Sequence, residues 1–418
     1  MDKIRIEGPC RLRGRVRISG AKNAVLPEMA AALLVEGPVT LTNVPAVRDV
    51  ETMAKVLRHL GLRDVALEGS LLRIGAGEPG EPEAPYALVK TMRASILVLG
   101  PLLARLGRAR VSLPGGCAIG ARPVDLHIEA LRRMGATITI EHGYVVGSCR
   151  RLRGAEISFD KKTVTGTENL MMAACLAEGR TALENCALEP EIADLARFLN
   201  ACGARVEGAG TGRIEVHGVP RLAGAEHRVI PDRIEAGTFV MAALATRSGI
   251  TVEACEPAHL VAVVDKLKEC GADLRVERDA IEVRPDGPLR AANVVTVPYP
   301  AFPTDLQAQY MALMTRAEGV SIITESVFEN RLMHVGELRR MGARIVVDGQ
   351  AAIVAGPSPL SGAPVMASDL RASACLIVAG LAAQGETTID RAYHIDRGYE
   401  RVERKFQELG ARIERVRG

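Results

Sequence analysis

The segment VLPEMAAALLVEG (residues 25–37) decides the fold, because three later segments repeat its character. They are NLMMAACLAEG (169–179), TFVMAALATRSG (238–249) and RASACLIVAGLAAQG (371–385). Each is apolar around nearly its whole circumference, and each ends at a glycine. A helix that is apolar on every side is buried rather than amphipathic. The sequence therefore predicts buried helices that recur along the chain.

Two series of glycines give this recurrence a period of about 70 residues. The first series follows the apolar helices and stands at Gly37, Gly107, Gly179, Gly249, Gly319 and Gly385. The second follows amphipathic runs and stands at Gly61, Gly135, Gly203, Gly271, Gly342 and Gly410. We expect the second series to supply the C′ residues of amphipathic helices, since glycine adopts a left-handed backbone at little cost. Short runs such as TITI (137–140) and IVV (345–347) follow and predict strands that lead into hairpins.

Six such units are too many for one hydrophobic core. The sequence predicts an α/β protein with two domains of three units each and a boundary near residue 230. Residues 1–21 precede the first full unit and form an expected strand. Its arginines at 11, 13, 15 and 17 are typical of a solvated edge strand.

Composition excludes several classes of protein. The 418 residues carry a net charge of +3, no Trp, six Tyr and six Phe, so neither a nucleic-acid surface nor a base-stacking platform is expected. No apolar run reaches the roughly 18 residues of a membrane span, and the first residues do not form a signal peptide. We therefore expect a cytoplasmic protein without membrane contact. Nine Cys without a Cys-x-x-Cys pair predict neither a disulfide framework nor a metal site.

Cations recur at the predicted ends of these elements, at Lys22, Arg93, Arg122, Lys162, Arg331, Arg371 and Arg397. If the two domains face each other, the cations meet in one cleft. Such a cleft would bind a substrate with several negative charges, such as phosphates and a carboxylate. The alternative for any one of these residues is a local cap or a surface ion pair.

Three further residues carry possible chemistry. Cys117 lies in a loop with Gly115, Gly116 and Gly120, close to Arg122. A nearby cation lowers a thiol pKa, so Cys117 is a candidate proton donor or covalent acceptor. Asp305 and Asp369 stand at the starts of predicted buried helices. Each is either a simple N-cap or a base for a substrate hydroxyl.

Seven motifs together resemble one enzyme family. They are SGAKNA (19–24), VKTMRAS (89–95), LPGGCAIGARPVDLH (113–127), FPTDLQAQ (302–309), FENRLMHV (328–335), SDLRAS (368–373) and YHIDRGYER (393–401). In order and spacing the chain closely resembles the UDP-N-acetylglucosamine enolpyruvyl transferases, or 1-carboxyvinyltransferases, from about residue 3 to residue 416. The Cys-containing loop is the most specific of the seven motifs.

The resemblance implies an inside-out α/β barrel in each domain, with three repeats of buried helices behind outward sheets. It implies domains at 22–229 and at 1–21 plus 230–418, with the active site in the cleft between them. Members transfer the enolpyruvyl group of phosphoenolpyruvate to the 3′-hydroxyl of UDP-N-acetylglucosamine and release phosphate, which opens peptidoglycan synthesis. They need no metal and no organic cofactor, and they are targets of fosfomycin.

The resemblance also implies site residues. Cys117 is the loop cysteine that protonates the phosphoenolpyruvate methylene and reacts with fosfomycin. Lys22, Arg122 and Arg397 hold the phosphate and carboxylate, Asp305 is the base, and Asp369 and Arg371 lie beside the reacting centre. Contacts to the nucleotide sugar are expected from Asn23, Arg93, Arg122, Pro123, Val124, Asp125, Leu126, Lys162, Thr163, Val164, Thr165, Gly166, Asp305, Val327 and Arg331. Val164 has no hydroxyl for a phosphate, so only its backbone would serve there.

Three other functions remain open at this point. The sister enzyme that uses shikimate 3-phosphate shares the fold, but it lacks the Cys loop. RNA 3′-end cyclisation would need a nucleophilic His, and the low aromatic content counts against it. A non-catalytic nucleotide-sugar sensor is disfavoured by the joint presence of Cys117, Lys22, Asp305 and Arg397.

Overall fold

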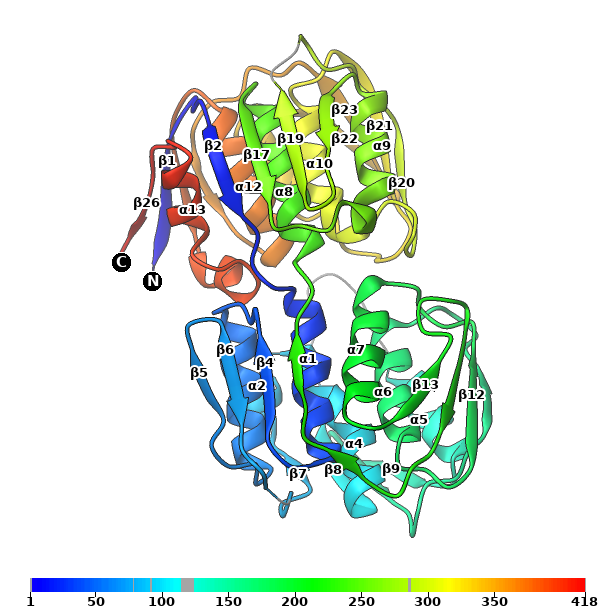
Figure 1. Cartoon of the computed structure of the whole chain (residues 1–418). Coiled ribbons are helices and arrows are strands. Elements are labelled where there is room, and N and C mark those ends of the chain that lie inside the picture. The colour runs from blue at the N-terminus through cyan, green and yellow to red at the C-terminus, as the bar shows by residue number, and fades with distance from the viewer. Residues whose placement is uncertain (1, 78, 91, 114–123, 285–286, 418) are drawn as a thin grey trace. The chain divides into compact units, whose positions relative to one another are not determined.

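The computed structural model of the chain describes residues 2–77, 79–90, 92–113, 124–284 and 287–417. These residues form two compact units, whose elements are labelled in Figure 1. The N-terminal unit comprises residues 20–113 and 124–230, and the C-terminal unit comprises residues 2–19 and 231–417. Within the described residues, the chain passes from one unit to the other after residue 19 and again after residue 230.

The N-terminal unit contains three four-stranded sheets in the described part of the chain. The first has the order β16 (Glu226–Arg228), β4 (Val39–Thr42), β6 (Leu71–Ile74), β5 (Ala66–Glu68). The second has the order β7 (Glu83–Ala84), β8 (Arg108–Ser112), β10 (Tyr144–Ser148), β9 (Thr137–Glu141). The third has the order β11 (Glu156–Ser158), β12 (Arg180–Glu184), β14 (Arg213–His217), β13 (Arg205–Glu207).

The C-terminal unit likewise shows three four-stranded sheets among its described residues. One has the order β24 (Pro364–Met366), β25 (Gly385–Asp390), β1 (Lys3–Gly8), β26 (Ile413–Val416). Another has the order β2 (Arg13–Arg17), β17 (Gly249–Glu253), β19 (Ala280–Arg284), β18 (Asp273–Val276). The last has the order β20 (Val294–Thr296), β21 (Gly319–Glu325), β23 (Ala351–Gly356), β22 (Arg344–Asp348).

All of these sheets share one pairing pattern. Read in the orders given, the first pair of strands is parallel, and the second and third pairs are antiparallel. Strand β2 lies at the edge of its sheet, and its residues Arg13, Arg15 and Arg17 are exposed. The interpretation as a solvated edge strand is therefore confirmed for these three arginines. The expectation of a single strand before residue 22 is wrong, because the segment forms β1 and β2 in different sheets and Arg11 lies outside both.

Behind the sheets lie the apolar helices that the sequence predicts. They are α1 (Lys22–Ala31), α4 (Leu99–Leu106) and α6 (Val164–Ala174) in the N-terminal unit, and α8 (Arg233–Ala245), α10 (Gln307–Met314) and α12 (Leu370–Ala382) in the C-terminal unit. Every residue of α8 and α12 is buried, and α8, α10 and α12 pack against one another (Figure 1). Each unit has its own hydrophobic core.

The amphipathic helices are α2 (Arg48–His59), α5 (Asp125–Arg133), α7 (Pro190–Ala201), α9 (Val261–Glu269), α11 (Val335–Arg340) and α13 (Val402–Glu408). The glycine after each of them has a positive φ of 89° to 104°. Their predicted C′ role is thus confirmed. In the first glycine series Gly249 differs, because Arg247 takes the positive φ and Gly249 begins β17.

Short elements complete the described chain. They are α3 (Tyr86–Val89), the 3-10 helices η1 (Ala32–Leu34), η2 (Arg93–Val98), η3 (Pro257–Leu260), η4 (Thr304–Leu306) and η5 (Ala392–Arg397), and the strand pair β3 (Val35–Glu36) with β15 (Leu222–Ala223). The prediction of a single helix that ends at Gly37 is therefore wrong. The α-helix ends at Ala31, because Val35 and Glu36 pair with Leu222 and Ala223 instead. Within the described ranges, no helix has the length and apolarity needed to cross a membrane.

Candidate active site

The carboxylate of Asp305 is the centre of a cluster in the C-terminal unit. Its Oδ1 accepts a hydrogen bond from Arg331 Nη2 at 2.7 Å, and its Oδ2 accepts one from Arg371 Nη2 at 2.7 Å. Three elements position these residues: η4 carries Asp305, the segment before α11 carries Arg331, and the first turn of α12 carries Arg371. The structure thus brings together three of the predicted site residues.

The two guanidiniums are buried, whereas the carboxylate reaches solvent. The side chains of Arg331 and Arg371 are 5% and 7% exposed, and that of Asp305 is 25% exposed. Burial alone would raise the pKa of Asp305, but the charges and hydrogen bonds of Arg371 and Arg331 hold this pKa well below its usual range. Asp305 is therefore ionised at neutral pH, and the cluster has a net positive charge.

Glu325, at the end of β21, fixes one side of this cluster. Arg331 Nη1 donates to Thr304 Oγ1 at 2.9 Å, and Thr304 Oγ1 donates to Glu325 Oε2 at 2.8 Å. The other oxygen of Glu325 accepts the backbone N–H of Val327 at 2.9 Å. Val327, a predicted substrate contact, is thereby tied to the same network. Sequence reasoning assigns no role to Glu325, because it lies just before the FENRLMHV motif.

Tyr399 lies next to Arg371, the second arginine of the Asp305 cluster. Its hydroxyl lies 3.5 Å from Arg371 Nη1 and 2.8 Å from Thr238 Oγ1, and it accepts from Gln309 Nε2 at 3.2 Å. Burial raises the pKa of Tyr399, so its hydroxyl keeps its proton at neutral pH. Tyr399 and Gln309 belong to recognised motifs, but the sequence gives no reason to place their side chains against Arg371.

Asp369 and Asp305 differ in their local roles. Asp369 is the N-cap of α12, where its Oδ1 accepts from the N–H groups of Arg371 at 2.8 Å and Ala372 at 3.1 Å. Asp305 makes no such cap, so the capping interpretation is confirmed for Asp369 and wrong for Asp305. Burial lowers the pKa of nearby His334 to about 4 even though the charge of Asp369 opposes this shift.

Arg397, the third predicted cation of this unit, is the last residue of η5 and is partly exposed. The element η5 packs against α12, which carries Arg371 just after its Asp369 cap. Arg397 thus lies on an element in direct contact with the helix that begins at the Asp305 cluster.

Lys22 begins α1 in the N-terminal unit. Its Nζ lies 2.9 Å from Oδ2 of Asp49, in the first turn of α2, and the two side chains are 13% and 4% exposed. A largely buried carboxylate therefore holds the ammonium group of Lys22 in place. Asn23 follows Lys22 on α1 and is partly exposed. The sequence gives no signal for Asp49 beyond its place at the start of an amphipathic helix.

His127 joins several of the expected nucleotide-sugar contacts. Asn169 Oδ1 accepts from Gly100 N–H at 2.7 Å, so Asn169 Nδ2 donates to His127 Nδ1 at 2.9 Å. The imidazole proton then lies on Nε2, which faces Thr165 Oγ1 at 3.3 Å. Burial, together with the charge of Arg93, lowers the pKa of His127 to about 4. The structure therefore groups Thr165 and Arg93 around a neutral His127 that directly follows Asp125 and Leu126.

The segment 162–166 has a structural role of its own. Thr163 is the N-cap of α6, and its hydroxyl accepts from Gly166 N–H at 3.1 Å. A Cβ at Gly166 would lie only 2.3 Å from Thr163 Cγ2, so glycine is required there. Lys162 is exposed and Val164 begins the helix. Cys117, Arg122 and Pro123 lie outside the described residues, and Val124 is the buried residue that precedes α5.

Solved structures share this fold. The enolpyruvyl transferase NikO from Streptomyces tendae matches with a TM-score of 0.89 and 27% identity, over 99% of both chains. An EPSP synthase from Acinetobacter baumannii matches with a TM-score of 0.77 over the whole of both chains, and at 19% identity it shows the fold alone. The chain thus has the α/β fold of the enolpyruvyl transferases.

Sequence comparison gives the family. The model of EPSP synthase (3-phosphoshikimate 1-carboxyvinyltransferase) matches residues 6–406. A UDP-N-acetylglucosamine 1-carboxyvinyltransferase of Anaeromyxobacter dehalogenans is 59% identical over 422 residues and covers 100% of both chains. One from Sorangium cellulosum is 57% identical over 420 residues, which is 100% of this chain and 99% of the relative. The chain belongs to the enolpyruvyl transferase family, and the resemblance drawn from the motifs is confirmed.

Proposed function

We propose that this protein transfers the enolpyruvyl group of phosphoenolpyruvate to the 3′-hydroxyl of UDP-N-acetylglucosamine and releases phosphate. This reaction is the first committed step of peptidoglycan synthesis. The observation that carries the proposal is the 55–59% identity, over the full chain, with proteins called UDP-N-acetylglucosamine 1-carboxyvinyltransferase. The name of the family model refers to the sister reaction on shikimate 3-phosphate, so the choice of acceptor depends on these relatives.

The reaction is an addition followed by an elimination. The sugar oxygen forms a bond to C2 of phosphoenolpyruvate while a base takes the hydroxyl proton and an acid protonates C3. A proton then leaves C3, and phosphate leaves C2 with the electron pair of its C–O bond. The protein must therefore hold two anionic groups, accept a proton at the sugar oxygen and deliver one at the methylene carbon.

Asp305 is the proposed acceptor of the hydroxyl proton. Its carboxylate is partly exposed and its orientation is fixed by Arg331 and Arg371, which suits a group that must point at one hydroxyl. Both arginines also lower its basicity, and a base works best when its pKa lies near the working pH. A substrate anion that takes over hydrogen bonds from Arg331 or Arg371 would raise the pKa of Asp305, so substrate binding itself would activate the base.

The remaining roles follow the family motifs. Lys22, Arg122 and Arg397 bind the phosphate and carboxylate of phosphoenolpyruvate, and Asp369 and Arg371 lie beside the reacting centre. The nucleotide sugar contacts Asn23, Arg93, Arg122 to Leu126, Lys162 to Gly166, Asp305, Val327 and Arg331. The Lys22–Asp49 ion pair holds Lys22, and the His127 network holds Thr165, before substrate arrives. These contacts support the first and second of these groups.

Cys117 is the proposed acid that protonates C3, and its thiol is the proposed point of attack of fosfomycin. A thiol beside arginines reacts more readily than one buried in an apolar core, because a neighbouring cation favours the thiolate. The contrast with the core cysteines is large, since burial raises the pKa of Cys186 and Cys255 to about 11.

The architecture proposed for the family extends these roles. We assign residues 22–229 to one domain and residues 1–21 with 230–418 to the other. Six similar four-stranded sheets and six apolar helices in the described chain support three repeats per domain, with helices enclosed by outward sheets in an inside-out barrel. With substrates of this kind, the reaction belongs in the cytoplasm.

A phosphate-release assay tests the proposal. Phosphoenolpyruvate is supplied with UDP-N-acetylglucosamine, with shikimate 3-phosphate, or with no acceptor. We expect release only with the nucleotide sugar. Equal release with shikimate 3-phosphate would favour the sister reaction, and binding of UDP-N-acetylglucosamine without any release would favour a non-catalytic sensor.

A further inference from the structure

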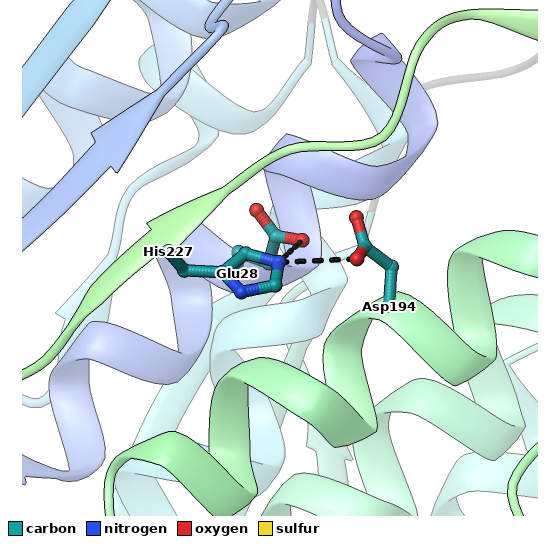
Figure 2. Close-up of side chains that lie close together, drawn as sticks. All are labelled: Glu28, Asp194 and His227. Carbon is teal, nitrogen blue, oxygen red and sulfur yellow. Dashed lines mark hydrogen bonds and ion pairs between the residues drawn. The ribbon is translucent and has the colours of Figure 1, made fainter. Parts of the chain in front are cut away.

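Three ionisable side chains meet inside the N-terminal unit, apart from the residues of the proposed reaction. Glu28 comes from α1, Asp194 from α7 and His227 from β16 (Figure 2). His227 Nε2 lies 3.1 Å from Asp194 Oδ1 and 3.5 Å from Glu28 Oε1. One atom of each side chain lies within 4.8 Å of the others. The three residues are far apart in sequence, so no local motif announces them.

The cluster is buried, and one member lacks hydrogen bonds. The side chains of Glu28 and Asp194 are 0% and 1% exposed, and that of His227 is 12% exposed. Neither carboxylate oxygen of Glu28 has a hydrogen-bond partner among the described atoms, although Figure 2 shows Oε1 directed at the imidazole. Burying an unbonded carboxylate is costly. A cation bound by the three side chains would satisfy these oxygens.

Spacing and charge both match a divalent cation. Ligands held by one tetrahedral ion at about 2.0–2.2 Å lie roughly 3.3–3.6 Å apart, close to the observed separations. Metal ligands of this kind bind in their deprotonated form and release their protons on binding. Two carboxylates and a neutral imidazole then carry two negative charges, which one divalent ion balances. Imidazole with carboxylates suits Zn²⁺ and its transition-metal neighbours better than Mg²⁺ or Ca²⁺.

Neighbouring groups orient the ligands as outer-shell partners of metal sites do. Asp194 Oδ2 accepts the N–H of Ile230 at 3.0 Å, and the ring of Phe198 packs on the His227 imidazole with centroids 5.7 Å apart. Arg197, which is more than half exposed, donates to Asp194 Oδ1 at 2.9 Å, and a bound ion would compete with it for that oxygen. Of the three ligands, His227 has the largest exposed fraction, at 12%.

We infer that Glu28, Asp194 and His227 bind one divalent transition-metal ion of the Zn²⁺ type, with water as the fourth ligand. Its role is structural, because it joins α1, α7 and β16 and none of its ligands belongs to the proposed reaction. Helix α1 begins at Lys22, and β16 leads to the crossing at residue 230. The ion would thus hold the helix that presents Lys22 against the strand that leaves the unit.

Cobalt titration of the whole protein, after treatment with a chelator, tests this inference. We expect one Co²⁺ per chain, with the visible absorption of a nitrogen–oxygen site, without sulfur charge-transfer bands, and displaceable by Zn²⁺. Glu28→Gln and His227→Phe, which keep side-chain size, should each weaken binding by about tenfold or more. The control His217→Ala removes an exposed histidine of the same unit and should change nothing.

Circular dichroism of each variant shows whether it is folded. If a variant does not fold, the Co²⁺ titration of the unaltered protein still tests the inference. Absence of Co²⁺ absorption in the unaltered protein would overturn the inference. Sulfur charge-transfer bands would also overturn it, because they would assign the metal to cysteines. Unchanged affinity in folded Glu28→Gln and His227→Phe proteins would do the same.

Discussion

Replacing Asp305 by Asn removes its charge while keeping its shape. Arg331 and Arg371, 5% and 7% exposed, would lose their common counter-ion. Breaking a buried ion pair from one side costs about 3–5 kcal/mol. The amide oxygen still accepts one hydrogen bond, and the site of Asp305 is 25% exposed, so we expect a smaller loss of about 2–3 kcal/mol in the free energy of unfolding.

The effect on turnover is a separate readout, and in free energy it should be about as large as the effect on stability, because a 100-fold fall in kcat corresponds to about 2.7 kcal/mol. A positioned base contributes about 10²–10⁴-fold to the rate, so we expect kcat to fall by about 100-fold or more. The assay is phosphate release at saturating phosphoenolpyruvate and UDP-N-acetylglucosamine, at a temperature where calorimetry shows the variant folded.

A second buried ion pair in the same unit provides the control. Glu235 Oε1 lies 2.6 Å from Lys405 Nζ, and the two side chains are 2% and 15% exposed. Glu235→Gln should therefore destabilise the protein by a comparable amount while kcat stays close to that of the unaltered enzyme. If folded Asp305→Asn protein also keeps its kcat, Asp305 only holds the two arginines and the proposed base is wrong.

The other predictions concern the thiol, pH and the α6 cap. Cys117→Asp should retain some turnover and resist fosfomycin, and mass mapping of the unaltered enzyme should place the label on Cys117 alone. Because the pKa of His127 falls from 6.5 to about 4 on folding, the unfolded chain binds the extra proton between these values. Acidification from pH 7 to 5 should therefore cost about 2 kcal/mol through His127, and His127→Gln should reduce this pH dependence in calorimetry. Thr163→Ala should cost about 1 kcal/mol as a lost N-cap. Gly166→Ala should cost less in that variant than in the unaltered protein, because the clash with Thr163 Cγ2 is gone, and a double-mutant cycle measures the difference.

The sequence predicts the fold well where a segment can satisfy its physical requirements in only one kind of structure. Segments such as 371–385, apolar on all sides, can only be buried, and the glycines after the amphipathic helices mark their ends by a positive φ. The first apolar segment shows the limit of this reasoning. Its residues Val35 and Glu36 pair with Leu222 and Ala223, which follow almost two hundred residues later. The hydropathy pattern does not predict this pairing.

The sequence likewise predicts some features of the candidate site and not others. Motifs identify Asp305, Arg331 and Arg371, but their mutual contacts span 26 and 66 residues and depend on how the helices pack. The hydrogen bond between Thr238 and Tyr399 spans 161 residues. Whether an aspartate caps a helix also depends on backbone geometry, so sequence alone does not separate Asp369 from Asp305.

An acceptor competition tests the central claim most directly. The enzyme receives phosphoenolpyruvate with equal concentrations of UDP-N-acetylglucosamine and shikimate 3-phosphate, and mass spectrometry identifies every enolpyruvyl product. The account predicts enolpyruvyl UDP-N-acetylglucosamine, formed in step with phosphate release, and no enolpyruvyl shikimate 3-phosphate. Enolpyruvyl shikimate 3-phosphate as the main product, or no enolpyruvyl product from either acceptor, would contradict it.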